Sequence, residues 1–193
     1  WIACGVAQRN SMAGVGVGLA APLAMDRWQA LLGVAPALAA RWEGVDPGRV
    51  VGALCDWPVD AMKDTAAACV AELVAGRGRD IHSFLYIFVD TFVGGGLVID
   101  GRLRGGVSGN AGAIGSMPLG MAGAHAPAPQ LLSIASLHTL EMAWSAAGLQ
   151  SPGTGSAQVL DAPWGAVTEH WIATAANAMA QVISSAACLL DLE

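Results

Sequence analysis

Residues 83–105 read SFLYIFVDTFVGGGLVIDGRLRG, and this stretch carries the strongest fold signal in the chain. Ser83 to Asp90 is rich in aromatic and β-branched residues, which favour strands. Gly94 to Ile99 predicts a second strand, and Asp100-Gly101 is a dipeptide typical of tight hairpin turns. Arg102 to Gly105 then begins the return strand. The stretch therefore predicts consecutive strands joined by a hairpin.

Strands and helices are predicted on both sides of this stretch. Before it we expect a buried strand at Met12 to Ala21, a helix capped by Asp46-Pro47 and running to about Leu54, a short strand at Pro58 to Met62, and a helix from Asp64 to Ala75 that stops at Gly76. After it we expect a loop at Gly105 to Gly115 and long helices at Gln130 to Ala147 and Pro163 to Leu190, separated by a linker at Gln150 to Ser156. This mixture indicates the α/β class.

Composition limits the classes of function. Of the 193 residues, 54% are hydrophobic and 12% charged, which indicates a packed core rather than disorder. The net charge of −6 does not supply the basic surface that nucleic acids require, so any DNA binding would belong to a segment outside this chain. Trp171 to Leu192 is apolar but contains Asn177 and Gln181, so we interpret it as a buried helix and expect no membrane partner. The cysteines lack CxxC spacing and suit a reducing, cytoplasmic compartment.

The first segment with chemical interest is Lys63-Asp64-Thr65, where a strand ends and a helix opens. A carboxylate at such a junction can accept a proton from a bound hydroxyl. Asp64 can equally serve as the N-cap of the helix, and the two roles are compatible.

Two glycine-rich segments follow. In Asp90 to Gly96, glycines would let the backbone approach phosphate oxygens, although a tight hairpin needs glycine too. In Gly106 to Pro118, the glycines indicate close approach of the backbone to a ligand or to another strand.

Taken in this order, the three segments resemble the ROK (repressor, open reading frame, kinase) family. In that family a sugar-binding Asn-Asp pair opens a helix with Glu eight residues after the Asp, and Lys63-Asp64 with Glu72 is similar in spacing. The family's second phosphate motif, Gly-Thr-Gly-Val-Gly-Gly-Gly, resembles Asp90 to Gly96. Its signature Gly-x-x-Gly-x-Ala-Gly-Glu-Ile-Gly-His-Met-Pro resembles Gly106 to Pro118. The resemblance extends from Met12 to Glu193.

The resemblance implies a fragment of the two-lobed, actin-like ATPase (ribonuclease H-like) fold. Residues 1–62 would end the first lobe and residues 63–193 would form the second. The family's N-terminal phosphate loop, or the helix-turn-helix of its regulators, would precede Trp1. It also implies a sugar site at Lys63, Asp64 and Asn110, with Asp64 as the catalytic base if the protein is active. A degenerate phosphate loop would retain Thr91, Gly94 and Gly95.

Several residues depart from the family pattern. Lys63 replaces the Asn, Asp90 and Phe92 replace phosphate-loop glycines, Ala113 replaces the sugar-binding Glu, and Ser116 replaces the zinc-ligating His. Gly120 to Gln130, where the zinc cysteines should follow, has none. His125 and His138 alone cannot complete a four-ligand zinc site, so we expect no metal.

These losses favour a ROK-type transcriptional regulator or sugar sensor that binds a small carbohydrate in the inter-lobe cleft, with little or no kinase activity and no cofactor. The alternative is an ATP-dependent sugar or amino-sugar kinase that uses ATP and Mg²⁺. A third is a structural dimer module without a ligand. We expect a homo-oligomer.

Overall fold

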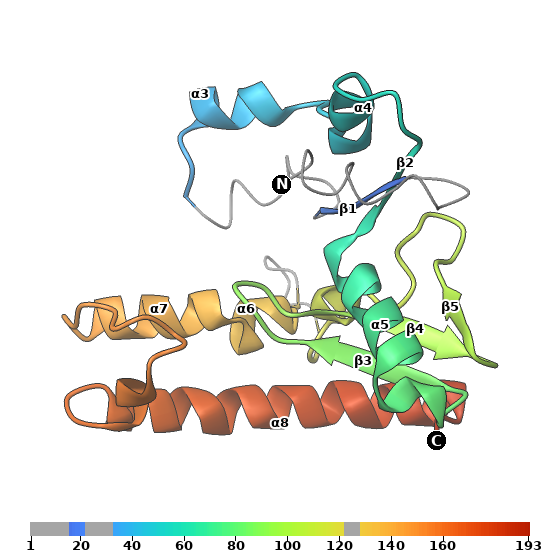
Figure 1. The fold of residues 1–193 in the computed structure, drawn as a ribbon. Helices are drawn as coiled ribbons and strands as arrows, with labels where there is room; N and C mark the ends of the chain where they lie inside the picture. The colour runs from blue at the N-terminus through green and yellow to red at the C-terminus, as the bar shows by residue number, and fades with distance from the viewer. Residues whose placement is uncertain (1–15, 22–32, 122–127) are drawn as a thin grey trace. The chain divides into compact units, whose positions relative to one another are not determined.

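The computed structural model describes residues 16–21, 33–121 and 128–193 (Figure 1). The chain divides into two units, Trp1–Ala67 and Ala68–Glu193, with the boundary inside one helix. Each unit is described by itself below.

The first unit contains a two-stranded parallel sheet. Strand β1 (Val17–Ala21) pairs with β2 (Val59–Lys63), with Val17 opposite Val59 and Ala21 opposite Lys63. The strand predicted at Met12 to Ala21 is thus present from Val17, whereas residues 12–15 lie outside the described residues. A parallel pair requires a crossover connection, as in α/β proteins.

Among the described residues, three short helices lie between these strands in the sequence. They are α3 (Pro36–Ala39), η1 (Ala40–Trp42) and α4 (Pro47–Gly52). The predicted cap of α4 is confirmed, because Asp46 Oδ1 accepts hydrogen bonds from Gly48 N at 2.9 Å and Arg49 N at 3.3 Å. The helix ends before the predicted Leu54, since Leu54 N donates to Val51 O at 2.9 Å and tightens the last turn.

Helix α5 (Asp64–Ala75) has the predicted bounds and crosses the boundary between the units. The helix ends before Gly76 as predicted, and Gly76 N donates a hydrogen bond to Glu72 O at 2.9 Å. The Glu72 carboxylate accepts from Arg77 N at 2.8 Å, at the start of η2 (Arg77–Arg79). Glu72 therefore fastens the turn that follows α5.

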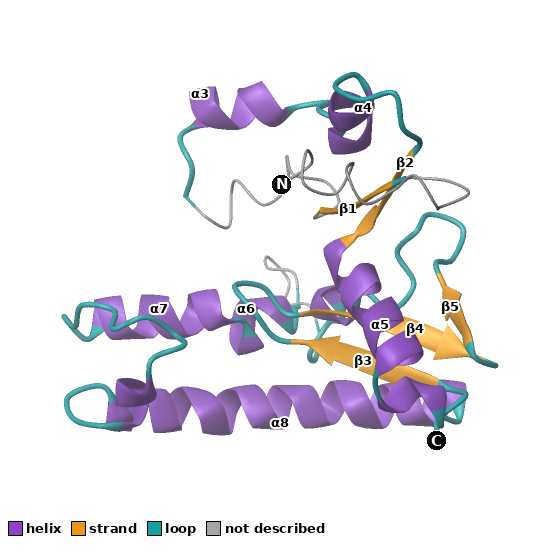
Figure 2. Cartoon of the chain, in the orientation of Figure 1, coloured by secondary structure: helices purple, strands orange, loops and turns teal. Residues whose placement is uncertain are grey.

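The second unit contains a three-stranded antiparallel sheet, drawn orange in Figure 2. Its strands are β3 (Phe84–Phe88), β4 (Gly94–Ile99) and β5 (Arg102–Arg104). The hairpin predicted at Asp100-Gly101 is confirmed, with Ile99 opposite Arg102 and φ of 53° and 68° at the two turn residues. Two consecutive positive φ angles define the tight turn that matches the twist of the strands.

The glycine-rich loop after β5 packs its backbone directly on β4. Gly112 has a φ of 78°, and a Cβ there would lie 2.7 Å from Leu97 N. A Cβ on Gly95 would lie 2.5 Å from Tyr86 O and 2.9 Å from Gly112 O. The sequence left open whether these glycines approach a ligand or a strand, and the described contacts are with the sheet. The short helix η3 (Ile114–Ser116) follows.

The single helix predicted at Gln130 to Ala147 is wrong, because the chain forms two helices, α6 (Leu132–Ala135) and α7 (Leu137–Ala146). Ser136 between them is extended, with ψ of 145°. Its buried Oγ donates to Leu132 O at 2.5 Å and accepts from Val93 N at 2.9 Å. The bond from Val93, 43 residues earlier in the chain, is thus made at the residue that separates α6 from α7.

Helix α8 (Gly165–Leu190) runs alongside α6 and α7 (Figure 1) and follows η4 (Ala157–Leu160). The indole N–H of Trp144 donates to Thr168 Oγ1 at 3.1 Å, and that of Trp171 to Thr139 Oγ1 at 2.8 Å. The core cluster of this unit consists of Val93, Ile114, Leu131, Ala135, Ala175, Ala178 and Val182. Of the described helices, α8 alone has the length and hydropathy of a membrane span, which a core helix can also have. The prediction of a buried helix is wrong for most of its length, because 22% of its apolar window is buried.

Candidate functional site

The Lys63-Asp64-Thr65 segment lies where β2 ends and α5 begins, within the first unit. Lys63 and Asp64 are partly buried. Asp64 Oδ1 accepts a hydrogen bond from Thr65 N at 2.7 Å, so the carboxylate binds an amide of the first helical turn. An N-cap side chain accepts from an amide two or three residues on, whereas this bond goes to the next residue and Asp64 is already the first residue of α5, so the predicted N-cap is not formed. The other carboxylate oxygen, Oδ2, makes no hydrogen bond within the described residues.

The Lys63 ammonium has neither a hydrogen bond nor an ion pair within the part of the chain that the structure describes. Burial lowers the pKa of Lys63 below its usual value, and the nearby Asp64 carboxylate acts in the opposite direction. The ammonium group of Lys63 can donate hydrogen bonds to a polar ligand, and the carboxylate of Asp64 can accept them.

The sequence placed Thr65 in this segment but assigned its side chain no role. Its side chain is 5% exposed, and Oγ1 finds no hydrogen-bond partner among the described residues. A threonine at the second position of a helix gives no sequence signal of this kind, since the missing partner depends on tertiary burial.

The loop between β3 and β4 contains the residues that resemble a phosphate motif. Thr91 N donates to Asp90 Oδ1 at 2.6 Å, and Val93 N donates to Ser136 Oγ at 2.9 Å. Both amides are therefore already hydrogen-bonded within the protein. A phosphate-binding loop turns amides of this kind toward the phosphate, whereas these two amides are bonded to Asp90 and Ser136.

The carbonyl groups of the same loop are also hydrogen-bonded. Asp90 O accepts from Leu137 N at 3.0 Å, and Thr91 O accepts from His138 N at 3.1 Å. The first amides of α7 thus hold the loop, and the Phe92 and His138 rings are in contact with centroids 5.6 Å apart.

Gly94 and Gly95 lie inside β4, opposite Phe88 and Ile87 of β3, and both are buried. Asn110 is exposed in the loop after β5, where its carbonyl accepts from Ala113 N at 3.2 Å. Thr91, Gly94, Gly95 and Asn110 all belong to the second unit, whereas Lys63 and Asp64 belong to the first.

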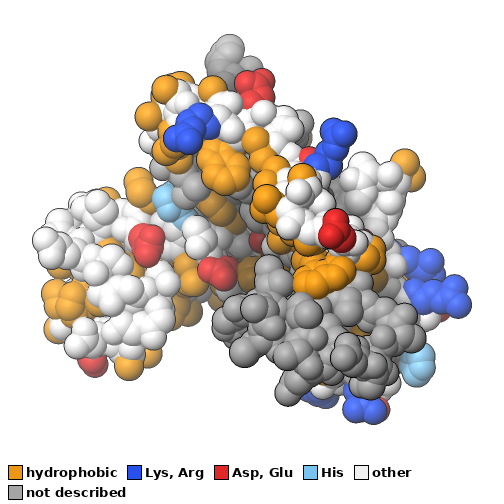
Figure 3. Space-filling model, turned by 45° about the horizontal axis from the view of Figure 1, so that its top comes forward, with side chains coloured by type: hydrophobic (Ala, Val, Ile, Leu, Met, Phe, Trp, Pro, Cys, Tyr) orange, Lys and Arg blue, Asp and Glu red, His pale blue; other side chains and the backbone are white. Residues whose placement is uncertain are grey.

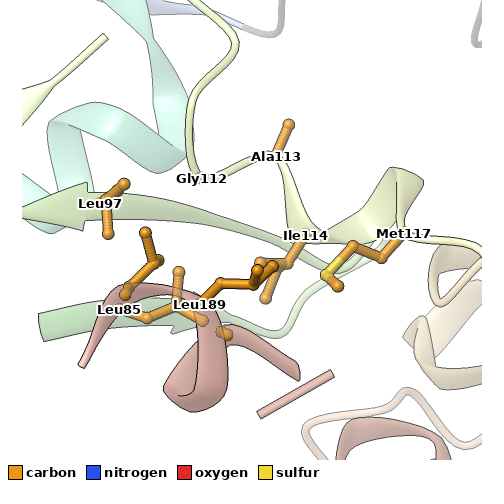
Figure 4. A pocket seen from close by; sticks show the side chains of 9 residues that line it. Leu85, Leu97, Gly112, Ala113, Ile114, Met117 and Leu189 are labelled. Atoms are coloured by element: carbon orange, nitrogen blue, oxygen red, sulfur yellow. The ribbon is translucent and has the colours of Figure 1, made fainter. Parts of the chain in front are cut away.

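A pocket in the second unit is lined by apolar groups (Figure 4). The lining residues are Leu85, Leu97, Gly112, Ala113, Ile114, Met117, Ala186, Leu189 and Leu190. The hydroxyl groups of a sugar would lose their hydrogen bonds to water there without replacement. This pocket is therefore unsuited to a carbohydrate.

The described residues hold no group of three His, Cys, Asp or Glu side chains placed to bind a metal. His138 contacts the Phe92 ring, and His125 lies outside the described residues.

Comparison with known proteins establishes the family. The model of the ROK family matches residues 4–191. The chain therefore belongs to the ROK family, which confirms the resemblance seen in the sequence.

The curated relatives match over a short part of their length. N-acetylmannosamine kinase from Escherichia coli O157:H7 is 45% identical over 67 residues, which cover 35% of this chain and 23% of the enzyme. A Vibrio cholerae N-acetylmannosamine kinase is 40% identical over 70 residues, covering 36% of the chain and 24% of the enzyme. The matched part thus spans about a quarter of these relatives.

Solved structures include both kinases and a regulator. The ROK hexokinase from Thermus thermophilus has a TM-score of 0.58 and 26% identity, covering 75% of this chain and 50% of the hexokinase. A ROK family transcriptional regulator homologous to the E. coli MLC protein has a TM-score of 0.57 and 23% identity, covering 76% of this chain and 40% of the regulator. The likeness confirms the predicted sugar-kinase, actin-like ATPase fold, of which this chain forms a part.

Proposed function

We propose that this chain is the sugar-binding part of a ROK-type transcriptional regulator or sugar sensor with little or no kinase activity. The observation that carries the proposal is the hydrogen bonding of the loop between β3 and β4. The amides of Thr91 and Val93 donate to Asp90 and Ser136, and the carbonyls of Asp90 and Thr91 accept from α7.

This arrangement opposes nucleotide binding in two ways. An amide already bonded inside the protein must give up that bond before it can contact a phosphate. The Asp90 carboxylate also places a negative charge at the loop, where it would repel a triphosphate. Both effects support a protein whose response to sugar does not involve phosphoryl transfer.

The proposed carbohydrate site uses Asp64 and Lys63 of the first unit. Asp64 Oδ2 can accept a sugar hydroxyl while Oδ1 keeps its bond to Thr65 N. The degenerate loop with Thr91, Gly94 and Gly95 has no part in this binding.

A regulator would need a DNA-binding segment outside this chain. On the face drawn in Figure 3, the Lys and Arg side chains of the described residues stand in separate small groups among apolar and uncharged atoms. Contact with DNA uses a continuous basic surface. We keep homo-oligomerisation and a cytoplasmic location as parts of this proposal.

An ATP-dependent sugar or amino-sugar kinase is the second candidate. Asp64 favours it, as the retained carboxylate that would accept the proton of the acceptor hydroxyl. Similarity to N-acetylmannosamine kinases also favours it. This candidate would require ATP and Mg²⁺, and the loop would have to release Thr91 N and Val93 N.

Calorimetry distinguishes the candidates. We expect the purified protein to bind at least one sugar of a hexose and amino-sugar panel, and to give no heat with the magnesium complex of a non-hydrolysable ATP analogue, with or without that sugar. Saturable binding of the analogue in the presence of sugar would contradict the sensor proposal and favour the kinase.

A further inference from the structure

The part of the second unit where α7 meets the first turns of α8 exposes large hydrophobic side chains. Met142 of α7 is 58% exposed, Leu160 of η4 is 60% exposed and Ile172 of α8 is 45% exposed. The indole N–H of Trp144 donates to Thr168 Oγ1 at 3.1 Å and joins the two helices here. Exposed hydrophobic side chains that gather in one place mark surfaces for partners.

These three side chains come from elements that pack against one another. Met142 and Ile172 each lie within about one helical turn of the bond between Trp144 and Thr168. Leu160 belongs to η4, which packs against α8. We call this part of the unit, which also includes the carboxylates described next, the α7–α8 end.

The α7–α8 end also carries carboxylates that no cation offsets. Glu141, Asp161 and Glu169 are exposed, and none of them makes an ion pair within the part of the chain that the structure describes. The sequence contains no Lys or Arg after Arg104. On the left of Figure 3, this part of the second unit shows Asp and Glu side chains among hydrophobic ones, without Lys or Arg. The surface is therefore both apolar and negatively charged.

The charge of the α7–α8 end decides which kind of partner fits it. A second copy of this chain would place the same carboxylates against each other, and like charges across an interface oppose association. An anionic membrane would be repelled for the same reason. A helix that carries Lys or Arg beside apolar side chains would bury the hydrophobic groups and pair with the carboxylates.

We propose that the α7–α8 end is a docking surface for a basic amphipathic helix of a partner protein. The apolar face of that helix covers the exposed hydrophobic side chains, and its Lys and Arg side chains pair with the three carboxylates. The surface belongs to the second unit alone, so the proposal does not depend on the sugar site of the first unit.

Fluorescence anisotropy with labelled synthetic peptides of roughly 18 residues, about five helical turns, tests the proposal. One peptide has Leu on one face and Lys on the other, a second has Glu in place of Lys, and a third has Ser in place of Leu. We expect saturable binding of one Leu/Lys peptide per chain, and at least about tenfold weaker binding of the other two. Equal binding of the Leu/Lys and Ser/Lys peptides would reduce the attraction to charge alone and would overturn the proposal.

Two double variants separate the α7–α8 end from the overall charge of the chain. Glu141→Gln with Glu169→Gln should weaken binding of the Leu/Lys peptide about tenfold. Asp80→Asn with Asp191→Asn removes the same charge from exposed positions of the same unit. This control should change the affinity less than about twofold, because Asp191 lies at the far end of the 26-residue α8 and salt screens charges over that distance. Equal weakening by both pairs would mean nonspecific attraction to an acidic chain, against the proposal.

Two single variants test the apolar contact. Met142→Ser and Ile172→Ser should each weaken binding of the Leu/Lys peptide about fivefold, because the peptide buries the exposed half of these side chains. Val74→Ser, at a 67% exposed position of α5, is the matched control and should bind as the wild type does. If the control loses affinity and the other two variants do not, the peptide binds elsewhere and the assignment is wrong.

Sedimentation equilibrium distinguishes a second copy of the chain as the occupant. Because the carboxylates oppose self-association through the α7–α8 end, Ile172→Ser should leave the oligomeric state of the wild type unchanged. Dissociation of an oligomer by Ile172→Ser would assign this surface to self-association and would contradict docking of a basic helix.

Discussion

At the residue scale, Asp64 is the residue that the family resemblance assigns to the sugar site and whose hydrogen bond the structure describes. Its carboxylate binds the amide of Thr65 at 2.7 Å, at the start of the helix that the sequence predicted. The location of Lys63-Asp64-Thr65 was predictable because a strand followed by a helix former has local signals. The unpaired Thr65 hydroxyl was not, since it depends on which distant groups cover the side chain.

Replacement of Asp64 tests its proposed role in binding. Asp64→Ala should abolish sugar binding measured by calorimetry and should lower the free energy of unfolding by about 1 kcal/mol, the usual effect of losing one intramolecular hydrogen bond. Asp60→Ala, at an exposed position of β2, is the matched control and should bind as the wild type does. Unchanged binding by Asp64→Ala would leave Asp64 with a structural role alone.

Cys69 gives a pH dependence that can be measured. Burial, together with the charge of Glu72, raises the pKa of the Cys69 thiol from 9.0 to about 11. Between these values the unfolded chain has lost the proton that the folded chain keeps, so the unfolded state binds fewer protons. The stabilisation is complete below pH 9 and is lost as the pH rises toward about 11.

Urea unfolding across this range checks the sign. Cys69→Ala removes the titrating group, so its free energy of unfolding should fall less steeply with pH than that of the wild type. Groups that titrate in both proteins cancel in the comparison. Parallel curves would show that the thiol has no raised pKa.

At the element scale, the glycine-rich loop is explained by its packing on β4. The sequence predicted the strands, the Asp100-Gly101 hairpin and α5 because each depends on neighbouring residues. It did not predict the break at Ser136, because the bond from Val93 N to Ser136 Oγ joins residues 43 positions apart. Local propensity cannot anticipate a bond of that separation.

Two glycines of this loop form a matched pair. Gly109 and Gly112 have φ of 72° and 78°, but a Cβ on Gly109 meets nothing within 4 Å, whereas one on Gly112 lies 2.7 Å from Leu97 N. Gly109→Ala should therefore cost about 1–2 kcal/mol of unfolding free energy from backbone strain alone. Gly112→Ala should cost a further 1–3 kcal/mol, roughly, from overpacking. If chemical denaturation gives both variants the same loss of unfolding free energy, the loop does not pack closely on β4.

At the scale of the whole molecule, membership of the ROK family is established, and the choice between regulator and kinase is a proposal. The sequence predicted the family because its three segments occur in order with the expected spacing. From Asp90 and Phe92 it also predicted weakened phosphate binding, which stays a prediction. The sequence did not show that the amides and carbonyls of this loop are hydrogen-bonded within the protein, because the bonds to its carbonyls come from α7.

A coupled assay of ADP release tests the central claim most directly. ATP and Mg²⁺ are supplied with each sugar of a hexose and amino-sugar panel, and a sugar that calorimetry shows to bind is included. The sensor proposal predicts no sugar-dependent release of ADP above background, even at saturating sugar. Sugar-dependent turnover in the ordinary kinase range, about 1–100 per second, would contradict it.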